Sequence, residues 1–223
     1  PLEKAKDNAN EAHQKGWTGL FGEHKEEWSN LWKSDILVDD KVLQRRIHTN
    51  LYYLLSSIRE DLNYSIPPCG LSNDGWGGHI FWDADTFMFP ALLLLHPKLA
   101  KIMVMYRYNT LDSARKNAKN AGYRGAAYGW QTALSGLEVG GGGKILSDEI
   151  HITGDVALAQ WQYYLATKDE EYLRKYASKV IIETAKFWES RVTYNEKFNH
   201  YEIKGVIPPD ESVCEKWGIK TVD

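Results

Sequence analysis

Apolar residues recur at helical spacing through most of the chain. Between residues 40 and 62 they form one stripe, three or four positions apart: Val42, Leu43, Ile47, Leu51, Leu54, Leu55, Ile58 and Leu62. This stripe predicts an amphipathic helix, and the carboxylate of Asp39 or Asp40 can accept the free N–H groups at its start. Residues 20–34 show the same kind of pattern and predict a helix before it.

More helices are predicted further along the chain. One should run from Pro97 to near Gly122, because proline suits a first helical turn and glycine commonly ends a helix. Residues 149–167 and 169–192 predict two more, joined by a short turn. The apolar run Phe87–Leu95 is too short to span a bilayer and predicts a buried core helix.

The strand signal is limited to one short hairpin. Its strands are predicted at Arg191–Tyr194 and Tyr201–Ile207, around a turn at 195–199. Glycine-rich loops separate the helices at 67–80, 122–144 and 205–210. Long helices that alternate with such loops predict an all-α toroid of antiparallel helices, with the loops gathered at one mouth.

Composition narrows the class of protein. The 223 residues are 43% hydrophobic and 26% charged, which suits one globular domain or part of one. The net charge of −3 offers no broad attraction for nucleic acid or an anionic membrane. Cys69 and Cys214 lie far apart, without the spacing of a disulfide framework or a CxxC metal site. The first residue is Pro1, and we expect the chain to begin inside a longer polypeptide.

The stretch Gly70–Asp85 holds the strongest candidate chemistry. It combines four glycines, two tryptophans, a histidine and three aspartates. Within it, Trp82 is followed by Asp83, and Trp130 is followed by Gln131 near another glycine-rich loop. An indole face suits a sugar ring, and a neighbouring carboxylate or amide can orient its hydroxyls. Packing of these indoles in the core is the alternative interpretation.

Glu211 is the candidate general acid. It follows Pro208, Pro209 and Asp210, and the two prolines stiffen the backbone before it. A fixed carboxyl beside apolar and aromatic surfaces can have a raised pKa and donate a proton. The local sequence by itself favours the alternative, a Pro-Asp turn with a solvated glutamate.

No metal or other cofactor is expected. Glu149 and His151, with the distant His79, resemble half a metal site in composition only, since neither HExxH nor any other paired-ligand spacing occurs. The glycine run before Lys144 lacks the spacing of a phosphate-binding loop. It favours a flexible loop or an engineered linker.

Six ordered motifs resemble glycoside hydrolase family 65, within residues 20–211. They are His79-Ile80-Phe81-Trp82-Asp83, Met88-Phe89-Pro90, the run Tyr106–Ala118, Tyr128-Gly129-Trp130-Gln131, the run Glu149–Asp155, and Pro209-Asp210-Glu211. The chain is most similar to the acid-trehalase-like branch, which includes kojibiose hydrolase-like α-glucosidases.

The resemblance implies an (α/α)6 barrel of six inner and six outer helices. Residues 1–34 would be linker helices, and residues 35–223 would form the first half of the catalytic barrel. The C-terminal half would be supplied by further sequence of the same polypeptide or by a second chain, neither of which is present here. Because the catalytic base would lie in that half, the chain alone should be inactive.

By the same resemblance, the family reaction is inverting hydrolysis of an α-glucoside. Glu211 would protonate the glycosidic oxygen, while a second carboxylate activates water on the opposite face of the sugar. The terminal glucose would be held by Trp82, Asp83, Trp130 and Gln131. The substrate would be a glucose-terminated disaccharide or glycan of the kojibiose, trehalose or glucosyl-galactose type.

Two other functions stay open. The phosphorylases of the family use phosphate in place of water and release glucose 1-phosphate, and the chain could also be a noncatalytic sugar-binding protein. Phosphorylases usually carry glutamate where Gln131 stands, which favours the hydrolase. A tyrosine often follows the catalytic pair where Ser212 stands, so that wall of the pocket should differ.

Overall fold

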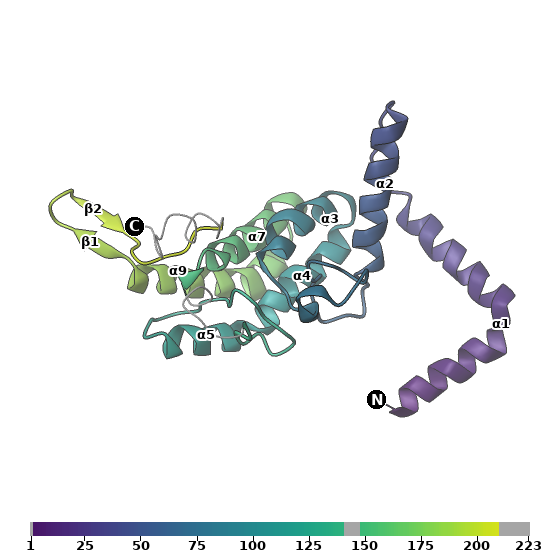
Figure 1. Cartoon of the computed structure of the whole chain (residues 1–223), viewed down its shortest axis with the longest axis horizontal. Coiled ribbons are helices and arrows are strands. Elements are labelled where there is room, and N and C mark those ends of the chain that lie inside the picture. Colours follow the sequence, from purple (N-terminus) through teal and green to yellow (C-terminus); the bar gives the residue numbers. More distant parts are fainter. Residues whose placement is uncertain (1, 141–147, 210–223) are drawn as a thin grey trace. The chain divides into compact units, whose positions relative to one another are not determined.

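The computed structural model describes residues 2–140 and 148–209, which are mostly helical (Figure 1). The elements are α1 (Leu2–Leu31), α2 (Lys41–Ser56), η1 (Gly75–Gly78), η2 (Ala84–Met88), α3 (Phe89–Leu95), α4 (Pro97–Asn109), α5 (Leu111–Asn120), α7 (Ile152–Thr167), α8 (Glu170–Tyr172), η3 (Leu173–Ala177), α9 (Ser178–Arg191), β1 (Thr193–Asn195) and β2 (His200–Glu202). They fall into two compact units, Pro1–His48 and Thr49–Asp223. No helix of the described residues is both long and apolar enough to cross a bilayer.

The first unit contains α1 and the start of α2. Helix α1 begins well before residue 20, and Gly16 interrupts it with a φ of 61° that glycine adopts easily. No residue of α1 is buried within the described structure. The pattern at 20–34 therefore located only the second part of this helical segment.

The predicted start of α2 is confirmed. Asp40 Oδ1 accepts hydrogen bonds from the backbone N–H groups of Val42 at 2.8 Å and Leu43 at 2.9 Å. These bonds satisfy donors that have no partner inside the helix. The helix ends at Ser56, earlier than the predicted Leu62.

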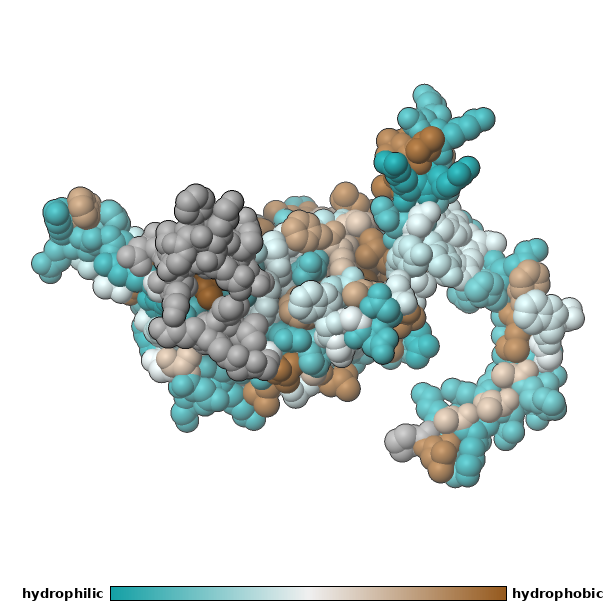
Figure 2. Space-filling model, viewed as in Figure 1, coloured by the Kyte–Doolittle hydropathy of each residue, from teal (hydrophilic) through white to brown (hydrophobic). Residues whose placement is uncertain are grey.

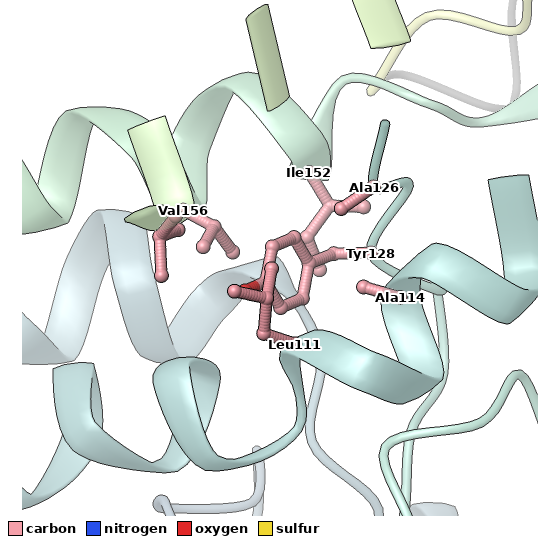
Figure 3. Close-up of a cluster of buried hydrophobic side chains, with 7 residues drawn as sticks. Leu111, Ala114, Ala126, Tyr128, Ile152 and Val156 are labelled. Carbon is pink, nitrogen blue, oxygen red and sulfur yellow. The ribbon is translucent and has the colours of Figure 1, made fainter. Parts of the chain in front are cut away.

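In the second unit, α3 packs on α4, α4 packs on α7, and α7 packs on α9. A cluster of buried side chains joins α5, α7 and α9 to the loop after α5 (Figure 3): Leu111, Ala114, Ala126, Tyr128, Ile152, Val156 and Val180. The Tyr128 ring lies among the other side chains, so the loop that leads to Trp130 is anchored in the core.

Two predicted helices are interrupted. The segment from Pro97 breaks at Thr110, whose φ of −98° and ψ of 10° separate α4 from α5. The buried Thr110 hydroxyl donates to the Tyr106 carbonyl at 2.9 Å. Helix α5 stops before Gly122, as predicted. In the segment predicted at 169–192, the π turn η3 separates α8 from α9.

The prediction that Phe87–Leu95 is a buried core helix is correct only in part. Phe89, Leu92 and Leu93 are buried, but Phe87 is 61% exposed and Leu94 is 80% exposed. The first residues of the run lie in the π turn η2, and the short helix α3 buries only one face. An apolar run without polar positions does not show which face that is.

The predicted hairpin is present and short. Strands β1 and β2 are antiparallel, with Tyr194 opposite Tyr201, and Asn199 in the turn has a φ of 54°. The second strand ends at Glu202 rather than Ile207. Hydrophilic residues cover most of the hairpin on the face shown in Figure 2.

A buried ion pair connects α4 to two loops. The side chains of Arg107 and Asp85 are 1% and 4% exposed, and Arg107 Nε donates to Asp85 Oδ2 at 3.1 Å. Arg107 also donates to the Phe81 carbonyl at 3.1 Å and the Thr132 hydroxyl at 3.4 Å. Thr132 exchanges backbone hydrogen bonds with Ile80 at 2.7 and 3.0 Å. Burial raises the pKa of Asp85, and the Arg107 guanidinium opposes that shift.

Arg107→Met should lower the free energy of unfolding by about 3–5 kcal/mol, because it leaves a buried carboxylate without its charge partner. Urea denaturation of the purified protein measures the change. The double variant Arg107→Met, Asp85→Leu removes both charges and should recover most of the loss. If Arg107→Met alone lowers the free energy of unfolding by less than about 1 kcal/mol, the interpretation that this buried ion pair needs both partners is wrong.

Gly125→Ala should destabilise the protein far more than Gly122→Ala. Both glycines have positive φ, 69° and 85°, but a Cβ at Gly125 would lie 2.2 Å from the Glu183 carbonyl oxygen of α9, whereas Gly122 has open space. Each variant pays about 1–2 kcal/mol for the left-handed backbone, and only Gly125→Ala must also move α9. Thermal denaturation of the two variants side by side measures the difference, and equal midpoints would contradict the close approach.

Candidate functional site

Three segments that are distant in sequence meet beside the buried ion pair: residues 79–85, residues 128–132 and the start of α7. The Trp82 and His151 ring centroids lie 4.8 Å apart at 86°, and those of Trp130 and His151 lie 5.5 Å apart at 69°. The two predicted sugar-binding indoles are therefore brought together, and both contact one imidazole. The bridge between Ile80 and Thr132 joins the loops at 67–80 and 122–144, two of the three glycine-rich loops that were expected to gather at one mouth.

These rings belong to a longer aromatic row. Consecutive edge-to-face contacts, with centroids 4.8–5.7 Å apart, join Trp76, Phe81, Trp130, His151, Trp82 and Phe87. The two ends of the row are exposed, Trp76 by 65% and Phe87 by 61%, whereas Trp130 in the middle is 8% exposed. The row therefore contains a buried indole, Trp130, and an exposed indole, Trp76.

Gln131 is held by its side chain and by its backbone. Its Nε2 donates to His79 Nδ1 at 2.8 Å, which leaves the amide oxygen available as an acceptor. Its backbone N–H donates to Glu138 Oε1 at 3.3 Å, and Gly140 N–H donates to the same oxygen at 2.8 Å. Burial raises the pKa of the Glu138 carboxyl, and these backbone donors oppose the shift.

The loop that presents His79 has an unusual backbone. Trp76, Gly77 and Gly78 all have positive φ, at 59°, 63° and 68°. The Tyr64 hydroxyl donates to the Gly78 carbonyl at 3.0 Å. Burial raises the pKa of Tyr64 to about 12, so the phenol stays a neutral donor. This bond fixes the loop immediately before His79.

Asp83 lies at the start of the π turn η2 and is partly buried. Its carboxylate makes no hydrogen bond with any residue that the structure describes, so both oxygens can accept from a ligand. Asp83 adjoins Trp82, and the structure thus presents an indole and a free carboxylate at neighbouring positions. An indole suits the apolar face of a polyhydroxylated ring, and a carboxylate can accept hydrogen bonds from its hydroxyls.

Glu211 lies outside the described residues, as do Asp210, Ser212, Cys214 and the glycine run 141–143 with Lys144. The last part of the described chain before Glu211 is anchored near the aromatic rings around His151. Ile207, four positions before Glu211, donates its N–H to the Asp148 carbonyl at 3.1 Å, and Asp148 precedes His151 by three positions.

A cavity of about 630 Å³ lies next to Trp130 and Glu138. Aromatic rings, carboxylates and amides line it together, including Tyr123, Asn117 and Asp148. Within residues 2–140 and 148–209, no group of three or more His, Cys, Asp or Glu side chains is placed so that it could hold a metal ion. His79 and His151 contact Gln131 and Asp155 instead.

Several residues around Trp82, Trp130 and Gln131 are not predicted from the sequence. His79 and His151 stand in two of the family motifs, but the sequence predicts no part in sugar binding for them or for Glu138. Arg107 carried a usable signal, since a lone cation beside the apolar residues Met103, Val104 and Tyr106 indicates a buried ion pair. The Gln131 partner of His79 comes from a distant loop that no spacing rule would reveal, whereas Asp155 lies four positions after His151 on the same helix.

A solved structure shares this fold. A putative kojibiose phosphorylase from the human microbiome matches with a TM-score of 0.85 and 27% sequence identity, over 95% of this chain and 30% of that chain. The helices and the hairpin described above are thus the arrangement found in part of that larger protein.

Curated relatives show higher identity. The kojibiose hydrolase of Flavobacterium johnsoniae is 46% identical over 88% of this chain and 29% of its own length. The kojibiose phosphorylase of Thermoanaerobacter brockii is 42% identical over 88% and 29%. The protein-glucosylgalactosylhydroxylysine glucosidase of Dictyostelium discoideum is 42% identical over 86% and 28%. The chain spans less than a third of the length of these relatives.

The match to a protein family covers most of the second unit and all the site residues named above. Residues 48–217 match the glycosyl hydrolase family 65 central catalytic domain, which confirms the resemblance carried by the six motifs. The chain belongs to glycosyl hydrolase family 65.

Proposed function

We propose that this chain supplies the glucose-binding side of an enzyme that hydrolyses α-glucosides with inversion. The observation that carries the proposal is the meeting of Trp82 and Trp130 around His151, beside a Gln131 amide held in place and an Asp83 carboxylate with no partner among the described residues. The indoles would stack on the apolar face of a terminal glucose, and the amide and carboxylate would orient its hydroxyls.

In this proposal Glu211 is the general acid. It protonates the glycosidic oxygen while water attacks the anomeric carbon from the opposite face, activated by a second carboxylate about 6.5–9.5 Å away. The anchor between Ile207 and Asp148 supports the assignment, because a four-residue extension reaches at most about 14 Å from it.

The proposal requires more protein than this chain. We propose that residues 1–34 are linker helices and that residues 35–223 form the first half of an (α/α)6 barrel. The C-terminal half, in the same or a second chain, would carry the catalytic base. The substrate would be an α-glucosyl disaccharide or glycan, as the names of the hydrolase and glucosidase relatives suggest.

A disaccharide phosphorylase is the second candidate. The 42% identity to a kojibiose phosphorylase and the likeness to a putative one favour it. Gln131 favours hydrolysis, since the family resemblance associates glutamate at this position with phosphorylases. A noncatalytic sugar-binding role would use the same pocket without proton transfer, so the experiments below distinguish all three.

The full-length protein should release glucose from kojibiose, nigerose or trehalose without phosphate. Because inversion converts an α-glucoside to a β-product, proton NMR of the first minutes of reaction should show β-glucose ahead of its mutarotation. Strict dependence on phosphate, with glucose 1-phosphate as product, would establish the phosphorylase instead.

Glu211→Gln should lower kcat by about 10²–10⁴, the usual contribution of a general acid, with a smaller loss on substrates whose leaving group needs no proton. Steady-state kinetics on the full-length protein measures the change. Glu196→Gln, at an exposed position in the hairpin turn, is the matched control and should leave the rate unchanged. Unchanged turnover of Glu211→Gln would refute its catalytic role.

A further inference from the structure

We propose that His151, held by Asp155, is a positioning residue that sets the angle between the Trp82 and Trp130 indoles. The inference builds on the proposed function, because it assumes that these two indoles form the walls of the glucose pocket. It adds a residue pair to which neither the motif comparison nor the sequence interpretation gave a part in sugar binding.

The imidazole lies between the two indoles. Its centroid is 4.8 Å from that of Trp82 and 5.5 Å from that of Trp130, and both contacts are edge-to-face at 86° and 69°. Among the described residues, the other ring on Trp82 is Phe87 and the other ring on Trp130 is Phe81. His151 is therefore the ring through which the orientation of one indole depends on the other.

A single hydrogen bond fixes the imidazole. His151 Nδ1 lies 2.8 Å from Asp155 Oδ2, one helical turn further along α7. Because a carboxylate only accepts, Nδ1 carries the proton in this bond. Nε2 is buried and has no hydrogen-bond partner within residues 2–140 and 148–209. The ring orientation thus depends on Asp155 and on packing against the indoles.

The helix that carries this pair is itself tied to the Trp130 segment. The buried Thr153 hydroxyl accepts a hydrogen bond from the Tyr128 backbone N–H at 3.0 Å, and Tyr128 precedes Trp130 by two positions. Ile152 packs in the same core cluster as Tyr128. The first turn of α7 therefore holds the backbone two positions before Trp130, next to the imidazole that contacts the Trp130 ring.

A fixed angle between the indoles matters because a sugar ring gains stacking energy only when the aromatic face is parallel to it. Small displacements of groups that orient a substrate can cost up to about 10²-fold in rate. Removal of the His151 ring would free both indoles at once, while the Glu211 proton donor would be untouched. The expected defect is in substrate binding rather than in proton transfer.

The experiment uses three variants of the full-length protein. His151→Ala removes the ring, His151→Phe keeps a ring without the Nδ1 donor, and Asp155→Asn weakens the hold on the imidazole at constant size. His48→Ala is the matched control, because His48 makes the same kinds of contact in the first unit, with Asp35 at 2.9 Å and the Trp32 ring at 5.1 Å.

His151→Ala should raise KM for the disaccharide by about tenfold to 10²-fold, with a smaller change in kcat. Its near-UV circular dichroism should change in the tryptophan bands while the far-UV spectrum stays the same. His151→Phe should recover part of both effects, and Asp155→Asn should fall between them and the wild type. His48→Ala should leave KM at the wild-type value.

Unchanged KM and unchanged tryptophan bands in His151→Ala would overturn the proposal. An equal rise in KM for His48→Ala would show a general loss of structure and would also overturn it. If His151→Ala does not fold, the Phe and Asn variants decide on the same two readouts. The proposed function is tested separately, by the activity of Glu211→Gln. If Glu211→Gln keeps its activity, the proposed function fails, and this result does not depend on the tryptophan spectra of the His151 variants.

Discussion

The contact between Arg107 and Asp85 is the constraint on which the loop cluster depends. A guanidinium and a carboxylate that are almost fully removed from water must satisfy each other, and this requirement fixes the distance between α4 and η2. The remaining guanidinium donors reach the Phe81 carbonyl and the Thr132 hydroxyl. The Arg107 carbonyl accepts from the Tyr128 hydroxyl at 2.7 Å, so one residue contacts both the 79–85 segment and the 128–132 segment.

Much of the fold could be predicted from the sequence because helices of this length show apolar residues at spacings of three and four positions. The α2 stripe, its Asp40 cap and the end of α5 before Gly122 all follow from local rules. The break at Thr110 does not, since the apolar pattern continues across it, where the structure shows a buried hydroxyl that bonds to the preceding turn.

The candidate site was predictable in part, for a different reason. Indoles next to polar side chains in or near glycine-rich loops suit sugar binding, and the family resemblance then points to Trp82 and Trp130 without a structure. Their convergence on His151 and the bond between Gln131 and His79 could not be predicted, because these contacts join residues that lie in separate segments of the chain. No local pattern encodes contacts between loops that only tertiary packing brings together.

The π turn at Ala84–Met88 has a consequence for how this region can vary in length. A π turn holds one residue more than an α turn, so loss of a single residue there would restore an ordinary helix. Every side chain before the deletion would then rotate by about 100° relative to α3. Asp85 would leave Arg107, and Trp82 with Asp83 would turn away from the facing loop. Chain length at this one point therefore governs how Trp82 and Asp83 are oriented relative to α3.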